Sequence, residues 1–530
     1  METRLVLALA LSLAILVGFQ LLVPAPPPAP DAQQTTSASS PEAPNAVSDV
    51  AASGAPEPAA DAAAPPGPTL EVRTDLYRAV FVSRGGRLTS FELNKYPATA
   101  DPESGPYDLI HADGAKPLAV VWRSATGGVV DDRAIAYELK STATEVGPGQ
   151  TATVTMVGRT ASGGTVSKTL ELRGGSYLLG YTVEAKGLGA TPIGVSWSRG
   201  LTADSSQAAN EGPVAYVDMD LQFFAANGLT EPAVLEGRFS WAGYAEHYFL
   251  AAYVPEEPVP AKLIAATGDG AGQATLWSTA PTERVQYQMY IGPKSMPELE
   301  KLGHDLDQAI DLGWFWIIAK PLMWALLLIE RVVGNYGWAI ILLTIAVRLL
   351  FYPVNKRQIE AMKGMQRIQP EIQKIQERFK DDREKLNREM MELYRRHKVN
   401  PLAGCLPMLL QLPVFVGLYN VLLQAIELRH APFFGWIDDL SQPDRLGHLA
   451  IPFLSPPGIP VLTLLMGASM IVQQKMTPST ADPTQQRMML FMPVIFTVMF
   501  VNFPAGLVLY WLSNNILSIG QQYLSNRQAS

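Results

Sequence analysis

A series of apolar runs, each near the length that crosses the hydrocarbon core of a membrane, most constrains this chain. One run spans residues 5–23, and five more lie at 336–354, 405–424, 459–475, 488–503 and 506–523. Hydrophobic residues make up 48% of the 530 residues, which favours a membrane protein over a purely soluble one. We therefore predict six transmembrane helices, with both chain termini in the cytoplasm.

The first run, residues 5–23, fits either a cleaved signal peptide or a retained signal anchor. Val23-Pro24-Ala25-Pro26 stands where a small-x-small cleavage site is expected, and proline there should obstruct processing. We therefore favour an uncleaved anchor over residues 1–23. Residues 24–68 are rich in proline, alanine and serine and hold no lysine or arginine, which predicts a disordered tether.

Residues 69–305 change to short alternating segments broken by glycine, as in "TATVTMVGRTASGGTVSKTLEL" at 151–172. A period of two with Gly-Gly punctuation is typical of antiparallel strands with one solvated face. We predict a large antiparallel β-sandwich. Because it follows an anchor that starts in the cytoplasm, residues 24–335 should lie on the outer side, in the periplasm where there is one.

Residues 306–334 hold an apolar run that fits either another span or a helix lying in the membrane interface. Lys320-Pro321 interrupts this run, tryptophans recur in it, and Glu330-Arg331 closes it, which favours the interface. Residues 355–400 carry 13 lysines and arginines and should be cytoplasmic, and one more span would place them outside. We predict an interfacial amphipathic helix at 306–334, a second span at 335–354, and four further spans at 401–526.

The basic segment 355–400 carries apolar residues at helical spacing on both sides of Asp381-Asp382. These are Ile372, Ile375 and Phe379 before the break, and Leu386, Met390 and Leu393 after it. Two helices folded back on each other would bury this stripe. Two interpretations remain open, a solvated hairpin that only sets topology and a docking site for a partner.

The usual signatures of enzymes are missing from the sequence. Gly467-Ala468-Ser469-Met470 lacks the final glycine of an intramembrane serine protease motif, and small residues that pack helices explain it better. There is no phosphate-binding loop and no zinc protease motif, and Cys405 is the only cysteine. We expect no catalytic residue, no metal and no cofactor, and we expect no sequence-specific binding of nucleic acid.

Arg348 lies inside the apolar run 336–354. It stands eight positions before Lys356, about 12 Å at the helical rise, which is too far for its side chain to reach bulk water. An unpaired arginine in hydrocarbon costs at least about 2.5 kcal/mol, so it should face a wet cavity, with water or an arriving group as its partner. Further polar residues in the spans suggest a hydrated groove: Thr344, Gln411, Asn420, Gln424, Asn502, Ser513, Asn514 and Asn515.

The segments "NPLAGCLPMLLQLPVFVGLYNVL" at 400–422 and "DPTQQRMMLFMPVIFTVMFVNFPAGLVLYWLSNNI" at 482–516, with the Arg348 span, closely resemble the YidC membrane protein insertase family. The resemblance implies five core helices around a groove open to cytoplasm and lipid, with Arg348 receiving the hydrophilic part of a substrate. It implies that spans 405–424 and 488–503 form a slide for the apolar part, with Tyr419 as a contact residue. On these spans we select Phe415, Leu418, Phe496 and Phe500 as slide residues. The outer domain resembles a β super-sandwich.

The resemblance also implies three partners: nascent inner-membrane proteins, the lipid bilayer of the bacterial inner membrane, and the Sec translocon. It implies that the chain acts either alone or together with the Sec translocon. Many members end in a basic tail, but this chain ends in "YLSNRQAS". A ribosome contact would therefore use the hairpin 355–400 and the loop 476–487. Two other classes stay open from the residues, a secondary transporter and a structural assembly factor.

Overall fold

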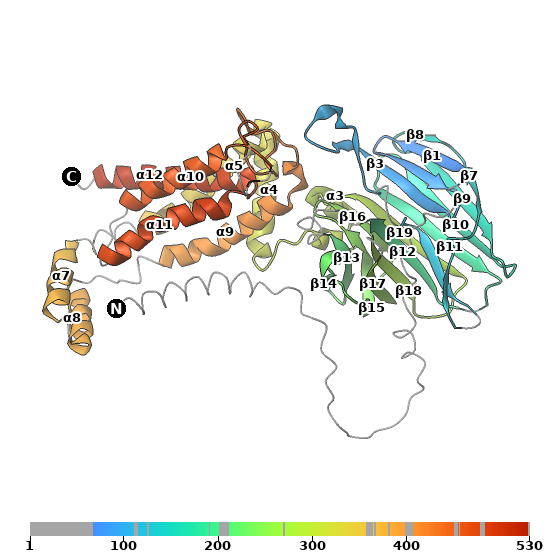
Figure 1. The fold of residues 1–530 in the computed structure, drawn as a ribbon, viewed down its shortest axis with the longest axis horizontal. Coiled ribbons are helices and arrows are strands. Elements are labelled where there is room, and N and C mark those ends of the chain that lie inside the picture. The colour runs from blue at the N-terminus through green and yellow to red at the C-terminus, as the bar shows by residue number, and fades with distance from the viewer. Residues whose placement is uncertain are drawn as a thin grey trace, which may run out of the picture. The chain divides into compact units, whose positions relative to one another are not determined.

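The computed structural model describes residues 67–110, 115–124, 127–189, 191–200, 211–268, 271–356, 364, 367–379, 382–397, 406–449, 454, 456–476 and 483–527. The chain divides into two compact units, Met1–Ala309, in which strands predominate, and Ile310–Ser530, which is helical (Figure 1). The anchor expected at 1–23 lies outside the described residues, as do the linker expected at 24–68, except its last two residues, and parts of the hairpin 355–400 and the loop 476–487.

The strands of the first unit form two sheets. A five-stranded sheet has the order β4-β3-β2-β1-β8, and a fourteen-stranded sheet has the order β6-β5-β12-β18-β17-β15-β16-β19-β11-β10-β9-β7, with β13 and β14 joined to it through β15. The strands are β1 Thr69–Thr74, β2 Tyr77–Val82, β3 Arg87–Pro97, β4 Pro106–Asp108, β5 Ala119–Arg123, β6 Val129–Asp131, β7 Tyr137–Ser141, β8 Glu145–Val146, β9 Thr151–Arg159, β10 Thr165–Arg173, β11 Leu178–Lys186, β12 Ile193–Gly200, β13 Gly212–Val217, β14 Asp220–Phe223, β15 Ala233–Ala245, β16 Phe249–Val254, β17 Val259–Gly268, β18 Ala271–Ser278 and β19 Arg284–Pro293. Short helices are η2 Pro102–Ser104, η3 Ala226–Gly228, α3 Met296–Leu302 and η4 Leu306–Ala309.

The hairpin of β9 and β10 shows how the alternating pattern builds the large sheet. Val154 and Met156 on β9 are fully buried, and the residues between them are half-buried or exposed. The two strands pair in antiparallel register from Thr165 opposite Arg159. Gly163 in the connecting turn has a φ of 87°, a left-handed conformation that glycine adopts without strain. The predicted antiparallel strand pattern is confirmed here.

One strand pair departs from the expected antiparallel arrangement. β1 and β8 run parallel, with Arg73 opposite Glu145. A parallel pair needs a long crossover connection, and here the chain passes through β2 to β7, and so through both sheets, before it returns to β1. The alternation of apolar and polar residues within one strand does not predict the pairing of strands that are far apart in the sequence.

A buried carboxylate links the two sheets. Asp132 accepts from Arg87 Nη1 of β3 at 2.7 Å, and Tyr137 of β7 donates its hydroxyl to it at 2.8 Å. Lys168 Nζ of β10 lies 2.6 Å from Oδ2, the oxygen that also accepts from Tyr137, whereas Arg87 donates to Oδ1. Burial alone would raise the pKa of Asp132, but the charges of Arg87 and Lys168 outweigh burial and hold the pKa below its ordinary value. Asp132 is thus an ionised group that depends on two cations from opposite sheets.

The second unit is built of helices. They are α4 Trp316–Val333, α5 Tyr336–Leu350, α7 Gln369–Arg378, α8 Arg383–Arg396, α9 Leu406–Gln424, the short η6 Ile426–Leu428, α10 Val461–Met476, α11 Pro483–Phe500 and α12 Ala505–Arg527. Helices α5, α9, α10, α11 and α12 overlap the five C-terminal runs of the sequence, with boundaries that differ by a few residues. Within the described ranges, none of the helices combines the length and the apolar character that crossing a bilayer requires.

Helix α4 occupies much of the segment 306–334, for which an interfacial helix is expected. It begins later than expected, after η4 and after Gly313. The φ of Gly313 is 69°, a left-handed conformation that turns the chain before the helix begins. Its buried residues are Ala319, Met323, Leu326 and Leu327, at helical spacing. Its opposite face exposes large apolar side chains, Trp316, Ile317, Trp324, Leu328 and Val332. An exposed apolar face with tryptophans is typical of a helix that lies in a membrane interface.

Helices α7 and α8 form the predicted hairpin where the structure describes it. Ile368, Ile372 and Leu393 are buried together, and Ile375, Met390 and Tyr394 pack against them. Asp382 begins α8 by accepting a hydrogen bond from Lys385 N at 3.1 Å. The predicted stripe is therefore confirmed at Ile372, Ile375, Met390 and Leu393, whereas Phe379 and Leu386 do not join this cluster.

We predict that Asp132→Asn destabilises the first unit by about 3–5 kcal/mol, because it leaves two buried cations without their counter-charge. The free energy of unfolding would be measured by pulse proteolysis of the full-length protein in detergent, at sites in residues 67–305. Glu138→Gln is the matched control, since the Glu138–Lys140 pair is exposed and should change the free energy by less than about 1 kcal/mol. Equal effects of the two substitutions would contradict the prediction.

We also predict a dependence on acid pH. The pKa of Asp132 is lower in the folded chain than the unfolded value of about 3.9, so its stabilisation is complete above that value and is lost as the pH falls through the folded pKa. The free energy of unfolding of the first unit should therefore decline below about pH 4, and this decline should be shallower in Asp132→Asn. An unchanged slope in the variant would show that other carboxyl groups cause the decline.

Candidate functional site

Arg348 lies in the last turn of α5 and is half-buried. The helix starts at Asn335, whose side chain accepts a hydrogen bond from Trp338 N at 3.1 Å and so caps the first turn. Arg348 Nη1 donates to Asn514 Oδ1 at 2.9 Å, and Nη2 donates to Ser518 Oγ at 2.6 Å. Both acceptors lie on α12, so the guanidinium joins these two helices.

The environment of Arg348 is polar but neutral. Asn514 and Ser518 stand four residues apart and therefore share one face of α12. The Ser518 hydroxyl also donates to the Asn514 carbonyl oxygen at 2.7 Å. Arg348 Nε is buried and has no hydrogen-bond partner among the described residues, and no carboxylate in that part of the chain forms an ion pair with Arg348. The cation therefore keeps its charge and one unused donor.

The sequence-based expectation named water or an arriving group as the partner of Arg348. This expectation missed Ser518, and it treated Asn514 only as one of several polar groove residues. The spacing of Asn514 and Ser518 could have predicted this pair of acceptors. Two polar residues one helical turn apart can accept from the two terminal nitrogens of one guanidinium group. The choice of α12 as the facing helix is not visible in the sequence.

Gln411 is a second predicted groove residue that lies near Arg348. Its side chain hydrogen-bonds Tyr510, and Tyr510 interacts electrostatically with Arg348. Gln411 comes from α9, so residues of α5, α9 and α12 meet around the arginine. Tyr510 was not among the predicted site residues, and it links the polar positions to the aromatic residues that follow.

The other predicted polar residues bond elsewhere. Thr344 is buried and donates to the Ile340 carbonyl oxygen of its own helix at 2.7 Å. Asn515 is buried and donates to Ser469 Oγ of α10 at 3.0 Å. Asn420 donates to the Leu312 carbonyl oxygen at 2.8 Å, beside Gly313, where any side chain would clash with its amide. Thr344 thus bonds within its own helix, Asn515 bonds to a neighbouring helix, and Asn420 bonds to the segment that precedes α4.

The residues predicted for the slide gather in an aromatic cluster around Trp511. The ring centroid of Trp511 lies 4.8 Å from Phe415, 4.9 Å from Phe500 and 5.9 Å from Phe496. Leu418 is 1% exposed, and Tyr419 meets Phe503 edge-on at 6.4 Å. These side chains point toward neighbouring helices.

The outward face of α11 carries a different set of apolar side chains, Phe491, Met492, Val494, Ile495, Val498 and Met499, all exposed. Val498 is the most exposed residue of this set, at 69%. A contiguous exposed apolar surface marks a site that contacts lipid or another apolar partner. The predicted slide residues Phe496 and Phe500 lie on the same helix and are half-buried and buried, respectively.

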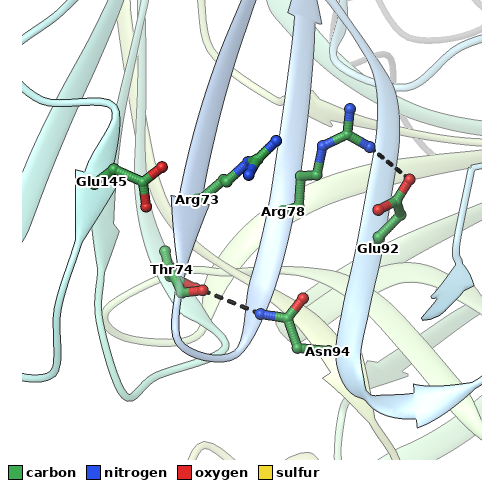
Figure 2. Close-up of a pocket in the computed structure, with 6 residues that line it drawn as sticks. All are labelled: Arg73, Thr74, Arg78, Glu92, Asn94 and Glu145. Atoms are coloured by element: carbon green, nitrogen blue, oxygen red, sulfur yellow. Dashed lines mark hydrogen bonds and ion pairs between the residues drawn. The ribbon is translucent and has the colours of Figure 1, made fainter. Parts of the chain in front are cut away.

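The first unit holds a polar pocket of about 490 Å³ on its five-stranded sheet (Figure 2). Charged side chains surround it, and Arg78 pairs with Glu92 at 2.6 Å and with Glu71 at 2.9 Å. Hydrogen bonds from Arg78 and Arg73 lower the pKa of Glu71 to about 2. The two arginines of this pocket are thus held in ion pairs with Glu71 and Glu92. Among the described residues, no group of three or more His, Cys, Asp and Glu side chains could hold a metal.

Comparisons with known proteins place both units. The family model of the YidC periplasmic domain matches residues 69–325, and that of the 60Kd inner membrane protein matches residues 328–530. A membrane protein insertase YidC of Pelobacter propionicus is 39% identical over 99% of each chain. One of Geobacter metallireducens is 37% identical over 99% of this chain and 98% of its own.

Among solved structures, an active YidC insertase with its first transmembrane domain resolved aligns at 20% identity with a TM-score of 0.37. It covers 86% of this chain and 94% of its own. The family assignment rests on the two family models and on the relatives that match over the full length. The chain belongs to the family of the YidC membrane protein insertases.

Proposed function

We propose that this chain inserts other proteins into the bacterial inner membrane and helps them fold, the activity that the names of its relatives state for them. The observation that carries the proposal is Arg348, a cation in an otherwise apolar helix that is bonded only to neutral groups. A structural arginine in such a place is usually paired with a carboxylate. An arginine that keeps its charge and a free donor is suited to receive an anionic or polar group.

The proposed function requires that the free-energy cost of moving a substrate's polar residues into the membrane be lowered. The apolar helix of a substrate gains free energy in lipid, whereas each charged residue at its flank costs several kcal/mol to bring into hydrocarbon. A wet groove around Arg348, Asn514 and Gln411 would let the flank travel part of the way in a polar surrounding. A positive charge in a low-dielectric cavity attracts an acidic flank more strongly than in water.

No energy-consuming step is required of the chain itself. The apolar part of the substrate supplies free energy when it enters lipid. For an acidic flank that moves outward, the membrane potential adds about 2.3 kcal/mol per charge for every 100 mV. The role of Arg348 is therefore to lower a barrier, and the chain acts as a chaperone of insertion with no catalytic residue.

The apolar part of the substrate would follow α9 and α11. The exposed face of α11, with Val494 and Val498 among its residues, provides an apolar surface toward lipid. The aromatic cluster around Trp511 would support this face from behind and keep α9, α11 and α12 together. In this proposal the slide is the exposed face of α11, backed by Phe415, Leu418, Phe496 and Phe500.

The remaining assignments belong to the same proposal. Six spans place both termini in the cytoplasm and residues 24–335 in the periplasm, with α4 in the outer interface. The α7–α8 hairpin, together with the loop 476–487, is the surface through which a ribosome would bind. The Sec translocon is a further partner in this proposal. The β-sandwich is assigned a scaffolding role, because the charges of its pocket pair with one another.

We predict that Arg348→Ala lowers the insertion of a single-span substrate with an acidic N-terminal tail by roughly tenfold or more, since 1.4 kcal/mol in a barrier is tenfold in rate. Arg348→Lys should keep most of the activity, because it keeps the charge. The measurement is protease protection of the translocated tail in liposomes that contain no other translocase.

Arg331→Ala is the matched control for this series, since Arg331 lies exposed at the end of α4 and forms no ion pair with any described residue. It should insert the substrate as well as the unaltered protein does. If Arg348→Ala also inserts normally, Arg348 has only a structural role and the proposal loses the observation that carries it.

We further predict that deletion of residues 70–300 leaves most of the insertion activity, because the site around Arg348 lies wholly in the second unit. The same liposome assay would measure this. Loss of most of the activity, in a variant that still reaches the membrane, would favour an assembly factor that acts through its outer domain.

A further inference from the structure

Residues 440–445 bond to the ends of three helices, and we name this stretch the outer clasp. It follows α9 and η6 in the chain and precedes α10. The carbonyl oxygens of Leu440 and Gln442 accept hydrogen bonds from Gly506 N at 2.8 Å and Ala505 N at 2.7 Å. These amides belong to the first turn of α12, where a helix leaves N–H groups without partners inside the helix. The clasp thereby caps the start of α12.

The clasp also caps the start of α10. The Asp444 side chain accepts from Leu462 N at 2.7 Å and from the Thr463 hydroxyl at 3.1 Å. Asp444 is 3% exposed, so this cap is buried. A carboxylate at a helix N-terminus satisfies free amides and interacts favourably with the helix dipole, which makes this contact a strong one.

Arg445 holds the end of α11 by its side chain. Its Nη1 donates to the Val501 carbonyl oxygen at 3.0 Å, and its Nη2 donates to Asn502 Oδ1 at 2.9 Å. Its Nε donates to the Pro456 carbonyl oxygen at 2.8 Å, which fixes the arginine within the loop. A cation that donates to the last carbonyls of a helix is favoured there by the helix dipole.

The three attachments differ in kind. The starts of α10 and α12 are held by main-chain groups and by a buried carboxylate, whereas the end of α11 is held through a half-buried side chain that donates to neutral oxygens. Helix α11 also leaves one apolar face uncovered, with Val494, Ile495 and Val498 at least half exposed. Of the three helix ends at the clasp, the end of α11 is therefore the one that separates most readily.

We propose that Arg445 is a latch that holds the outer end of α11 to the clasp, and that this latch opens in each insertion cycle. The proposal deepens the proposed function and rests on it, since there α11 guides the apolar helix of the substrate. When the latch opens, the outer end of α11 moves away from α10 and α12. The polar tail then passes outward from the level of Arg348, and the latch closes behind it.

The test strengthens the latch by one isosteric change. Asn502→Asp replaces a neutral acceptor of Arg445 by a carboxylate, so the hydrogen bond becomes an ion pair and the attraction between opposite charges is added to it. If the latch must open, the insertion rate of a substrate with an uncharged polar tail should fall about tenfold in liposomes. An uncharged tail is used so that the new carboxylate does not repel the substrate.

Two variants control this result. The double variant Asn502→Asp with Arg445→Ala keeps the carboxylate and removes its partner, and its insertion rate should return to that of the unaltered protein. Asn502→Ala removes one latch contact and should not slow insertion. The proposal is overturned if Asn502→Asp inserts at the unaltered rate, or if the double variant stays slow.

Hydrogen exchange of the full-length protein provides a readout that does not require insertion. Arg445→Ala should raise the exchange rate of the last turn of α11 about tenfold and leave the first turns of α10 and α12 unchanged. Unchanged exchange in α11, or equal increases at all three helix ends, would overturn the latch. Should Arg348→Ala insert normally while α11 responds as expected, the proposed function fails but the attachment of α11 by Arg445 stands.

Discussion

The need of a buried cation for partners organises the helical unit. Arg348 on α5 reaches two oxygens that stand one turn apart on α12, and this fork fixes the rotation of α12 about its axis. Successive residues of a helix point about 100° apart. With Asn514 turned to α5, its neighbour Asn515 is turned to α10, where it bonds Ser469. Adjacent asparagines thus connect one helix to two others.

The two units differ in how they stabilise a buried charge. In the β-sandwich, Asp132 is surrounded by two cations and a tyrosine hydroxyl, so the cluster is satisfied internally and dry. Arg348 is instead hydrogen-bonded by an amide oxygen and a hydroxyl oxygen, both neutral, within the described part of the chain. Removing one partner from a satisfied ion cluster is costly, whereas a cation held by neutral groups can exchange partners. The first arrangement suits a scaffold, and the second suits a site that must bind and release.

Much of this architecture follows from patterns of short range. The period of two in residues 151–172 predicts the β9–β10 hairpin, and the helical stripe through Ile372 and Leu393 predicts the α7–α8 packing, because both depend on which face of one element is apolar. Arg348 is found for a similar reason, since one charge in an apolar run stands out in the sequence. These features need no knowledge of the partner element.

Features that depend on the partner element were missed. Ser518 and Trp511 look like ordinary residues of α12 until the faces that meet α5, α9 and α11 are known. Phe415, Phe496 and Phe500, which were predicted for the slide, pack against Trp511, and an apolar helix gives no sign in its sequence of which side meets a neighbouring helix. The outer clasp holds the start of α12 through the main-chain carbonyl oxygens of Leu440 and Gln442, which carry no sequence signal.

The small core of the α7–α8 hairpin has a further consequence. Its buried centre consists of three aliphatic residues with three half-buried neighbours. Regions with few buried contacts open with a lower free energy than the rest of a protein. The hairpin can therefore unfold and refold as a separate cooperative segment while the helices around Arg348 keep their packing. A partner that stabilises or melts the hairpin would then leave the packing of the helices around Arg348 unchanged.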